Sequence, residues 1–388
     1  MPVKNRIAEM QPEIAAWRRD LHEHPELLFE VHRTAGVVAQ MLRSFGCDEV
    51  VEGIGRTGVV GVIHGRQPGT GRVLGLRADM DALPIIEATG VPHASKTPGV
   101  MHACGHDGHT AMLLGAAKYL AETRNFAGTV VVIFQPAEEG GAGGKVMCDD
   151  GMMDRWGITE VYGMHNMPGI PVGQFAIRPG PFFAATDTFS IVIEGRGGHA
   201  AKPHDTVDPT VVSAQMVMAL QTIASRNADP LKSVVVSVTS FRTESEAFNV
   251  IPQTVELRGT VRTLETDVRA MAQARVRAIA DHTAAAFGAT ATVHWRDGYP
   301  VMANHPEETV HAARVAADVS GQEVLEVPPL MGGEDFAYML EARPGAYILV
   351  GNGNTASVHH PAYDFDDNVI PAGVSWFVGL AESRMPAA

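Results

Sequence analysis

Apolar residues recur along the chain with two different periods. Several short runs are continuously apolar, which is typical of strands covered on both faces. The predicted strands are residues 57–63, 72–77, 129–134, 161–165 and 346–350. Helical spacing occupies residues 6–46, interrupted at Pro25, and also residues 110–120. Strands that alternate with helices predict an α/β fold, with a mixed, largely parallel sheet and flanking helices.

The stretch from residue 184 to residue 297 has another pattern. Its predicted strands alternate apolar and polar residues, and Asp208 followed by Pro209 is a helix-start signal. In chain order, the elements are a strand at 188–194, a helix at 208–225, strands at 233–241 and 254–263, a helix at 267–287 and a strand at 289–295. This β-α-β-β-α-β order is that of a ferredoxin-like α+β unit. We therefore expect a catalytic domain in two parts, 1–183 and 298–388, with an inserted domain at 184–297.

Composition and charge exclude several classes of protein. The 388 residues are 45% hydrophobic and 19% charged, which is normal for a globular protein and not for a disordered one. The net charge of −14 and the lack of a Lys/Arg-rich run argue against nucleic-acid binding. The sequence contains no stretch of 18 apolar residues and so predicts no membrane span. The N-terminus also lacks the apolar core of a signal peptide. Three cysteines do not form a disulfide framework, so we expect a cytoplasmic protein.

The densest polar cluster of the chain lies between residues 101 and 110. It contains His102, Cys104, His106, Asp107 and His109. These side chains offer metal-binding atoms of mixed softness, and the two glycines between them allow the backbone to fold tightly around an ion. A histidine-rich surface loop with a buried cysteine explains the cluster equally well when it is taken alone.

Two adjacent carboxylates, Glu138 and Glu139, follow the predicted strand 129–134. Ligands of open α/β sheets bind beyond the carboxyl ends of the strands. Adjacent carboxylates repel each other, and a cation beside them relieves that cost. One carboxylate can then be a metal ligand and the other a general base. The alternative is a solvated turn, and the position after a buried strand disfavours it.

His165 ends the predicted strand 161–165, and the pair His359 and His360 come after the predicted strand 346–350. The residues that follow these strands should converge on one edge of one sheet, together with Cys104 and His106. Five mixed N, O and S ligands are too many for one tetrahedral zinc and suit two adjacent divalent ions.

Four further residues have roles that the pattern leaves open. Asp79 and Asp81 follow strand 72–77 and are ligands, acceptors that orient a ligand histidine, or turn residues. In the inserted domain, His199 lies in a glycine-rich bend from which it can reach a substrate oxygen. The guanidinium group of Arg262 is suited to binding a carboxylate group.

Nine short motifs occur in order over nearly the whole chain. They are His24–Leu27, Leu76–Pro84, Met101–His109, Gln135–Gly140, Gly163–Asn166, Gly198–His204, Asn249–Pro252, Gly333–Phe336 and His359–Pro361. Together they resemble the M20 metallopeptidase and amidohydrolase family, and most closely its aminoacylase, hippurate hydrolase and auxin-conjugate hydrolase group.

The resemblance implies a two-metal peptidase-like catalytic domain and a role for each candidate residue. The implied metal ligands are Cys104, His106, Glu139, His165 and His359. Glu138 would be the general base, and Asn249 and Arg262 would hold the substrate carboxylate. His199 would polarise the scissile carbonyl from the partner subunit of a homodimer, or of a tetramer, formed through the inserted domain.

Two positions depart from the pattern or are ambiguous within it. The wider M20 family often has His-x-Asp where this chain has Arg77-Ala-Asp79. Arg77 cannot supply that histidine ligand, and the role of Asp79 stays open. His359 is preferred to His360 on the His-x-Pro spacing alone.

These observations predict a metal-dependent enzyme that hydrolyses the amide bond of N-acyl amino acids, such as hippurate-like or N-acetyl substrates. It would hold two divalent ions per subunit, Mn²⁺ or Zn²⁺, with Co²⁺ or Ni²⁺ as alternatives. Rival interpretations are a dipeptidase or carboxypeptidase of the same family, and an amidohydrolase that uses Cys104 as nucleophile. A further rival is a non-catalytic protein that binds metal or acyl amino acids. A chelator separates the metal enzyme from the thiol enzyme, and the sequence does not specify the acyl group.

Overall fold

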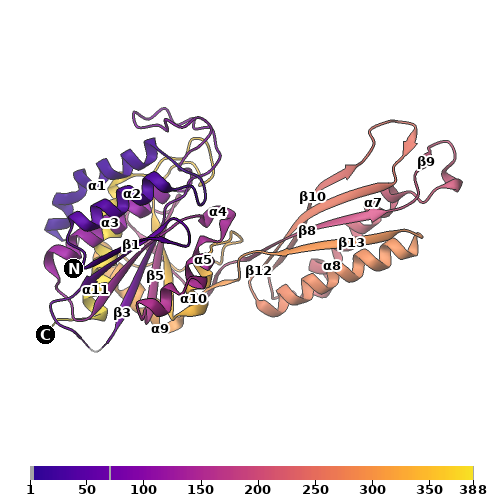
Figure 1. Ribbon diagram of the computed structural model, residues 1–388. Helices are drawn as coiled ribbons and strands as arrows, with labels where there is room; N and C mark the ends of the chain where they lie inside the picture. The colour runs from indigo at the N-terminus through magenta and orange to yellow at the C-terminus, as the bar shows by residue number, and fades with distance from the viewer. Residues whose placement is uncertain (1–3, 70, 388) are drawn as a thin grey trace. The chain divides into compact units, whose positions relative to one another are not determined.

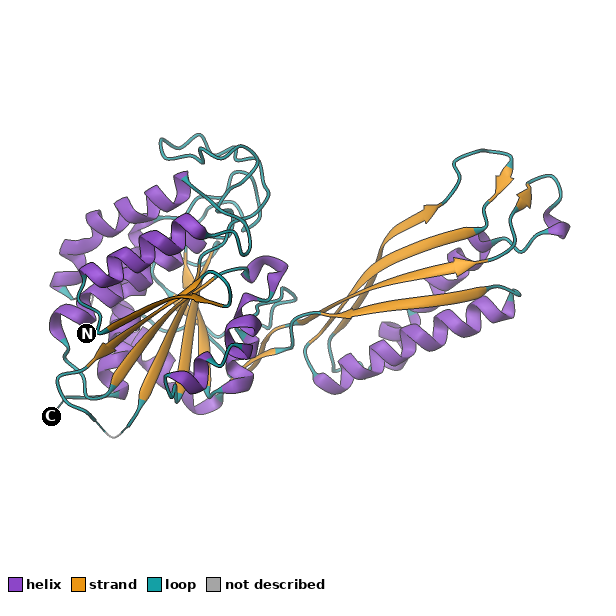
Figure 2. Ribbon diagram, viewed as in Figure 1, coloured by secondary structure: helices purple, strands orange, loops and turns teal. Residues whose placement is uncertain are grey.

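The computed structural model describes residues 4–69 and 71–387, and the chain divides into two compact units (Figures 1 and 2). Unit 1 comprises the chain up to Gly180, Ala303–Pro328 and the part from Asp335 onward. Unit 2 comprises Pro181–Met302 and Pro329–Glu334. Each unit has its own hydrophobic core.

Unit 1 is built on a seven-stranded sheet in the order β1-β2-β4-β3-β5-β15-β6. The strands are β1 (Glu49–Ile54), β2 (Gly58–His64), β3 (Val73–Asp79), β4 (Thr129–Gln135), β5 (Glu160–Met167), β6 (Phe175–Ala176) and β15 (Gly345–Gly351). The four central strands run parallel, and the outer strands pair antiparallel. The predicted α/β class with a mixed, largely parallel sheet is confirmed.

Helices cover both faces of this sheet (Figure 2). The longer ones are α1 (Asn5–Glu23), α2 (His32–Ser44), α3 (His106–Thr123), α9 (Pro306–Ser320) and α11 (Ile370–Arg384). The shorter ones are α4 (Glu138–Gly141), α5 (Gly143–Asp149), α6 (Met152–Arg155), α10 (Ala337–Ala342) and the 3₁₀ turn η3 (Asp367–Val369). The predicted break at Pro25 is confirmed, since this residue lies between α1 and α2.

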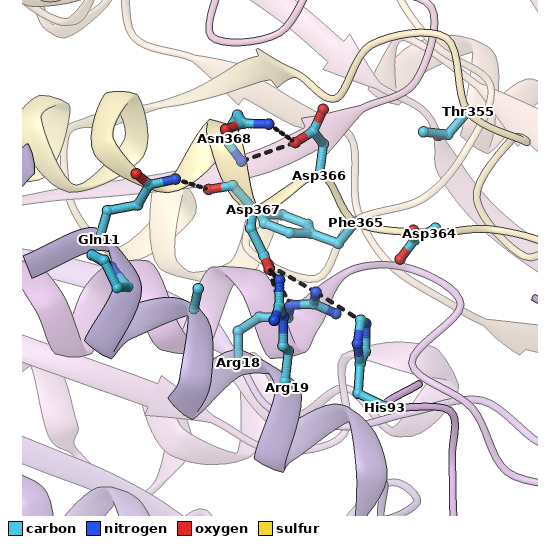
Figure 3. Close-up of a pocket in the computed structure, with 12 residues that line it drawn as sticks. Gln11, Arg18, Arg19, His93, Thr355, Asp364, Phe365, Asp366, Asp367 and Asn368 are labelled. Atoms are coloured by element: carbon cyan, nitrogen blue, oxygen red, sulfur yellow. Dashed lines mark hydrogen bonds and ion pairs between the residues drawn. The ribbon is translucent and has the colours of Figure 1, made fainter. Parts of the chain in front are cut away.

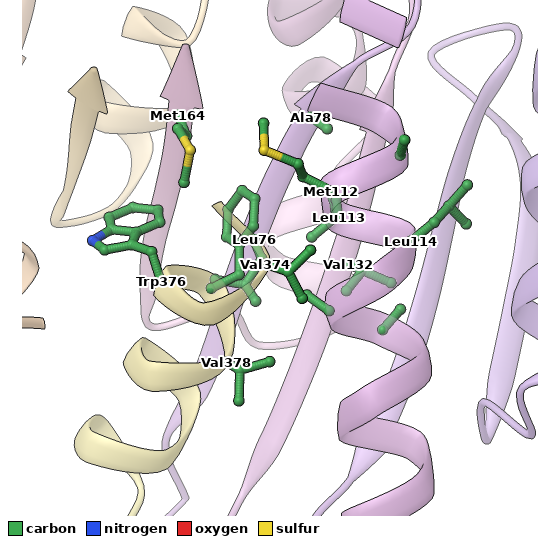
Figure 4. Packing of buried hydrophobic residues seen from close by; sticks show 14 of the residues in the cluster. Leu76, Ala78, Met112, Leu113, Leu114, Val132, Met164, Val374, Trp376 and Val378 are labelled. Atoms are coloured by element: carbon green, nitrogen blue, oxygen red, sulfur yellow. The ribbon is translucent and has the colours of Figure 1, made fainter. Parts of the chain in front are cut away.

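The core of unit 1 lies around α3. Figure 4 shows Met112 and Leu113 of α3 beside Leu76 of β3 and Val374 and Trp376 of α11. Almost every side chain of α3 is buried, because the helix contacts the sheet on one side and α1 and α11 on the other. The N-terminus of α3 is thereby fixed against the sheet.

Unit 2 contains a four-stranded antiparallel sheet in the order β10-β12-β8-β13. Its main elements are β8 (Ala185–Glu194), α7 (Pro209–Leu220), β10 (Val234–Thr243), β12 (Thr254–Thr263), α8 (Thr266–Ala286) and β13 (Thr290–Asp297). They follow the predicted β-α-β-β-α-β order. The side chain of Asp208 accepts the backbone N–H of Thr210, as its N-cap position requires. The predicted helix 208–225 is shorter than expected, because α7 ends at Leu220 and a separate π-helical turn η2 spans Ile223–Asn227.

A small two-stranded ribbon lies apart from the main sheet of unit 2. It pairs β9 (Gly198–His199) with β11 (Val250–Ile251), and a 3₁₀ turn η1 (Pro203–Asp205) follows β9. Two further short strands, β7 (Gly180–Phe183) and β14 (Met302–Asn304), lie where the chain passes from one unit to the other. Within the described residues, no helix combines the length and the apolar character needed to cross a membrane.

Candidate active site

Cys104 and His106 lie on either side of Gly105 at the start of α3. Gly105 has a φ of +85°, which favours glycine. A Cβ atom at this position would lie 2.2 Å from Nδ2 of Asn166 and 2.5 Å from the hydroxyl oxygen of Tyr363. The backbone between the two predicted ligands is therefore packed directly against these two side chains.

Asp81 connects His106 with the two glutamates that follow β4. Its Oδ1 accepts the backbone N–H of Glu138 at 2.9 Å, and its Oδ2 accepts that of Glu139 at 3.0 Å. Its carbonyl oxygen accepts a hydrogen bond from Nδ1 of His106 at 2.8 Å. Because Nδ1 of His106 donates its proton in this bond, Nε2 is the nitrogen that would bind a metal ion.

His165 lies in β5, and His359 lies in the segment that follows the neighbouring strand β15. The prediction made His165 the last residue of its strand, and β5 continues for two residues beyond it. His359 follows β15, and its Nε2 lies 3.1 Å from Oε1 of Glu139. His360 makes a different contact, since its Nδ1 accepts the backbone N–H of Ala362 at 3.0 Å. The geometry thus brings His359, and not His360, to the glutamate.

The predicted ligands and the predicted base gather in unit 1. Their ligand atoms form overlapping groups whose members lie within 4.8 Å of one another: Cys104, His106 and His165; Cys104, Glu139 and His359; His106, Glu138 and Glu139. The Sγ atom of Cys104 lies 3.3 Å from Nε2 of His165. One compact cluster therefore offers one sulfur, three imidazole nitrogens and two carboxylates.

Burial controls the charge of this cluster. Burial and the carboxylate of Glu139 raise the pKa of the Cys104 thiol. Burial and His109 hold the pKa of His165 well below its usual value, so this imidazole is neutral. For His106, burial opposes the charge, but Asp79 and Cys104 raise the pKa well above its usual value.

The cluster fits divalent cations. Nε2 of His106 and Oε1 of Glu139 are buried and have no hydrogen-bond partner of good geometry. Buried polar atoms normally have one, and the negative groups around His106, Asp79 and Cys104, supply charge that a bound cation would balance. Imidazole, thiolate and carboxylate together suit first-row divalent metals.

Asp79 is fully buried beside the cluster, and both of its oxygens are engaged. Oδ2 lies 2.7 Å from Nη1 of Arg77, and Oδ1 lies 2.7 Å from Nδ1 of His109. Arg77 also donates from Nε to Gln135 at 2.8 Å. Of the roles that the sequence leaves open for Asp79, these contacts favour that of an acceptor that orients its neighbours.

The predicted substrate residues lie in unit 2. His199 of β9 pairs with Val250 of β11, and the carbonyl of Asn249 accepts the N–H of Ala200 at 3.0 Å. His199 and Asn249 are exposed on the same ribbon. Arg262 is half-buried near the other end of β12, where it pairs with Thr186.

Arg262 lies far from this ribbon. The eight steps along the strand from Thr254 to Arg262 span roughly 26 Å. Since Thr254 pairs with Glu194 at the ribbon's end of the sheet, unit 2 brings His199 and Asn249 together but not Arg262.

A separate cavity of about 540 Å³ lies in unit 1 (Figure 3). Arg18 and Arg19 donate to Asp367 in its wall, each from Nε at 2.8 Å. Nη2 of Arg18 lies 3.2 Å from Nε2 of His93. None of the predicted site residues lines this cavity.

Comparisons with known proteins agree with this geometry. Residues 75–383 match the model of a protein family described as peptidase family M20/M25/M40. The chain is 42% identical over 380 residues to a Bacillus subtilis protein named N-acetyl-L-cysteine deacetylase, with 98% of this chain and 89% of that protein covered. It is 40% identical over 377 residues to the hippurate hydrolase of Campylobacter jejuni, with 97% of each covered. A solved Bacillus subtilis structure, described as a dinuclear metal-binding peptidase from the M20 family, matches with a TM-score of 0.85 and 35% identity, covering 98% of this chain and 100% of the other.

Proposed function

The chain belongs to peptidase family M20/M25/M40, and we propose that it is a metal-dependent amidohydrolase that splits N-acyl amino acids into a carboxylic acid and an amino acid. The observation that carries the proposal is the largely buried cluster in which Glu138 lies beside His106 and Glu139, which in turn group with the candidate ligands Cys104, His165 and His359. The names of two relatives, N-acetyl-L-cysteine deacetylase and hippurate hydrolase, support this substrate class.

The proposed ligands of two divalent cations are Cys104, His106, Glu139, His165 and His359. Mn²⁺ or Zn²⁺ is the proposed metal, with Co²⁺ or Ni²⁺ as alternatives. When bound, such ions polarise the amide carbonyl and make a water molecule easier to deprotonate. Asp81 orients the ligand His106 through its carbonyl oxygen, and Asp79 orients His109, which packs against the ligands.

Glu138 is the proposed general base. It is 7% exposed, and its backbone is fixed by Asp81, so its carboxylate is held beside the ligand atoms of His106 and Glu139. It takes the proton of the attacking water and returns it to the leaving amine. Glu139 is the better ligand, because its Oε1 faces His359.

Asn249 and Arg262 are the proposed partners of the substrate carboxylate, and His199 that of the scissile carbonyl. Roughly 26 Å of strand separate Arg262 from the ribbon that carries His199 and Asn249. One copy of unit 2 therefore cannot bring all three residues to one small substrate. This separation supports a homodimer through the inserted domain, 184–297, in which His199 serves the site of the partner subunit.

The thiol-nucleophile alternative is disfavoured by the environment of Cys104. Burial and Glu139 raise the pKa of its thiol, whereas a nucleophilic cysteine needs a lowered pKa. Peptidase activity within the same family remains the competing substrate class.

The test is a hydrolysis panel with metal-free protein and with added Mn²⁺, Zn²⁺, Co²⁺ or Ni²⁺. The substrates are hippurate, several N-acetyl amino acids and matched dipeptides, and the Glu138→Gln variant measures the background. We expect metal-dependent release of amino acid from N-acyl substrates, with a higher kcat/KM than for dipeptides. Undiminished activity without metal, or a consistent preference for dipeptides, would overturn the proposal.

A further inference from the structure

Asn166 and Tyr363 form a buried hydrogen-bonded pair directly behind the predicted metal ligands. Both side chains are 0% exposed. The hydroxyl of Tyr363 donates to Oδ1 of Asn166 at 2.6 Å. Burial raises the pKa of this phenol well above its usual value, so it keeps its proton and acts as donor. The bond therefore fixes the orientation of the Asn166 amide, with Oδ1 toward Tyr363 and Nδ2 toward the predicted metal ligands.

The other end of the amide, Nδ2, contacts the ligand segment. It donates to the carbonyl oxygen of Cys104 at 2.6 Å and lies 3.0 Å from Nε2 of His109. The backbone N–H of Asn166 donates to the same Nε2 at 2.9 Å. Asn166 also follows His165 directly, so one residue touches the backbones of two predicted ligands.

His109 also contacts Asn166, through its Nε2 atom. Its Nδ1 donates to Asp79, which leaves Nε2 as the acceptor for Asn166. Its ring centroid lies 4.6 Å from that of His165 and 5.5 Å from that of His106. His109 thus packs against two predicted ligands without being a predicted ligand itself.

The absence of a side chain at Gly105 shows how closely this assembly fits. A Cβ atom there would clash with the side chains of both Asn166 and Tyr363. The backbone that joins Cys104 to His106 is therefore packed tightly against two buried polar side chains, which limits its movement.

We propose that Asn166 and Tyr363 are positioning residues that orient Cys104 and His165 toward a shared cation, Tyr363 acting through the side-chain amide of Asn166. The inference rests on the proposed metal site and deepens it. Partners behind metal ligands typically contribute about 10–100-fold to metal affinity. Removing the Tyr363 hydroxyl takes away the donor to Oδ1 and leaves the Asn166 amide held through Nδ2 alone, and the separation of Cys104 and His165 is then less tightly fixed.

The test uses Co²⁺ as the probe and the Tyr363→Phe variant of the full chain. We expect its Co²⁺ affinity to fall about tenfold or more, and the thiolate-to-cobalt absorption band to shift. Tyr162→Phe is the matched control. Tyr162 is also fully buried, and its hydroxyl donates to Glu160 at 3.0 Å, away from the cluster. This control should lose comparable thermal stability while keeping the wild-type spectrum and affinity.

A second variant tests whether Tyr363 acts through Asn166. Asn166→Ala should weaken Co²⁺ binding at least as much as Tyr363→Phe, and adding Tyr363→Phe to it should cause no further loss. Wild-type protein without a thiolate-to-cobalt band would refute the proposed metal site itself. A normal wild-type band that survives unchanged in Tyr363→Phe, or additive losses in the double variant, would refute the positioning role alone.

Discussion

The Nδ1 atom of His22 lies 2.8 Å from Oδ2 of Asp107, and both side chains are fully buried. The pair joins α1 to the first turn of α3, next to the ligand segment. The other ring nitrogen of His22 lies 3.4 Å from Glu87. Burial opposes a charge on His22, but Asp107 outweighs it and raises the pKa of His22 to about 9.

This pair predicts that unfolding free energy falls at alkaline pH. A histidine whose folded pKa is raised stabilises the fold fully below its unfolded pKa, here 6.5. That contribution is lost as pH rises through about 9. The loss is about 3 kcal/mol over this range. Urea unfolding of the wild type and of His22→Gln between pH 6 and pH 9.5 measures it, and the difference between the two proteins should shrink as pH rises. A difference that stays constant would contradict the assigned charge.

The two glutamates should respond differently to the same substitution. Glu138→Gln removes the base and keeps its shape, so the metal content should persist while kcat falls ~10²–10⁴-fold. Glu139→Gln removes a charged ligand atom beside His359 and should lower the metal affinity instead. Metal analysis and steady-state kinetics on both variants separate the two roles. The opposite pattern would show that the assignments are exchanged.

The thiol of Cys104 should be protected from alkylation by bound metal. A metal-bound thiolate is shielded, and chelation should expose Cys104 to iodoacetamide. Cys47 and Cys148 serve as internal controls, because neither belongs to the cluster and bound metal should leave their labelling rates unchanged. Mass spectrometry of labelled peptides gives the rate for each residue. Equal rates at Cys104 with and without metal would exclude it as a ligand.

Much of the fold could be predicted because the central strands are short, continuous apolar runs. Several elements were not predicted, and two of them, β1 and α11, have a physical reason. Strand β1 lies at the sheet edge and is half exposed, so it has no such run. Helix α11 is buried almost all round from Ile370 to Ala381, so no polar stripe reveals its period.

The candidate site could be predicted only where its residues lie in local motifs. Cys104 and His106, like Glu138 and Glu139, are neighbours in the sequence, and their chemistry is visible there. Tyr363 and Asn166 are 197 residues apart, and their contact depends on the fold. An isolated tyrosine after a His-x-Pro motif carries no signal that could have identified it.

The last prediction concerns His199, which we expect to act in the site of the partner subunit. Glu138→Gln and His199→Ala homodimers should each be nearly inactive. If the two are mixed and exchange subunits at random, about half of the dimers contain one subunit of each kind. In such a dimer, one site combines an intact Glu138 with the intact His199 of the partner subunit, and the other site carries both defects. Roughly a quarter of all sites should therefore recover activity.

The opposite geometry gives a different result. If His199 served the site of its own subunit, every site in the mixture would keep one defect, and mixing would restore nothing. Native mass spectrometry must show that mixed dimers form, so that missing recovery is not missing exchange. Arg262→Ala mixed with Glu138→Gln is the matched control. Arg262 lies roughly 26 Å of strand from the ribbon of His199 and Asn249, and we place it in the site of its own subunit. In a mixed dimer, one site then carries the Glu138→Gln defect and the other site carries the Arg262→Ala defect. No activity should therefore return. Recovery with His199→Ala but not with Arg262→Ala is the outcome that a shared site across two subunits requires.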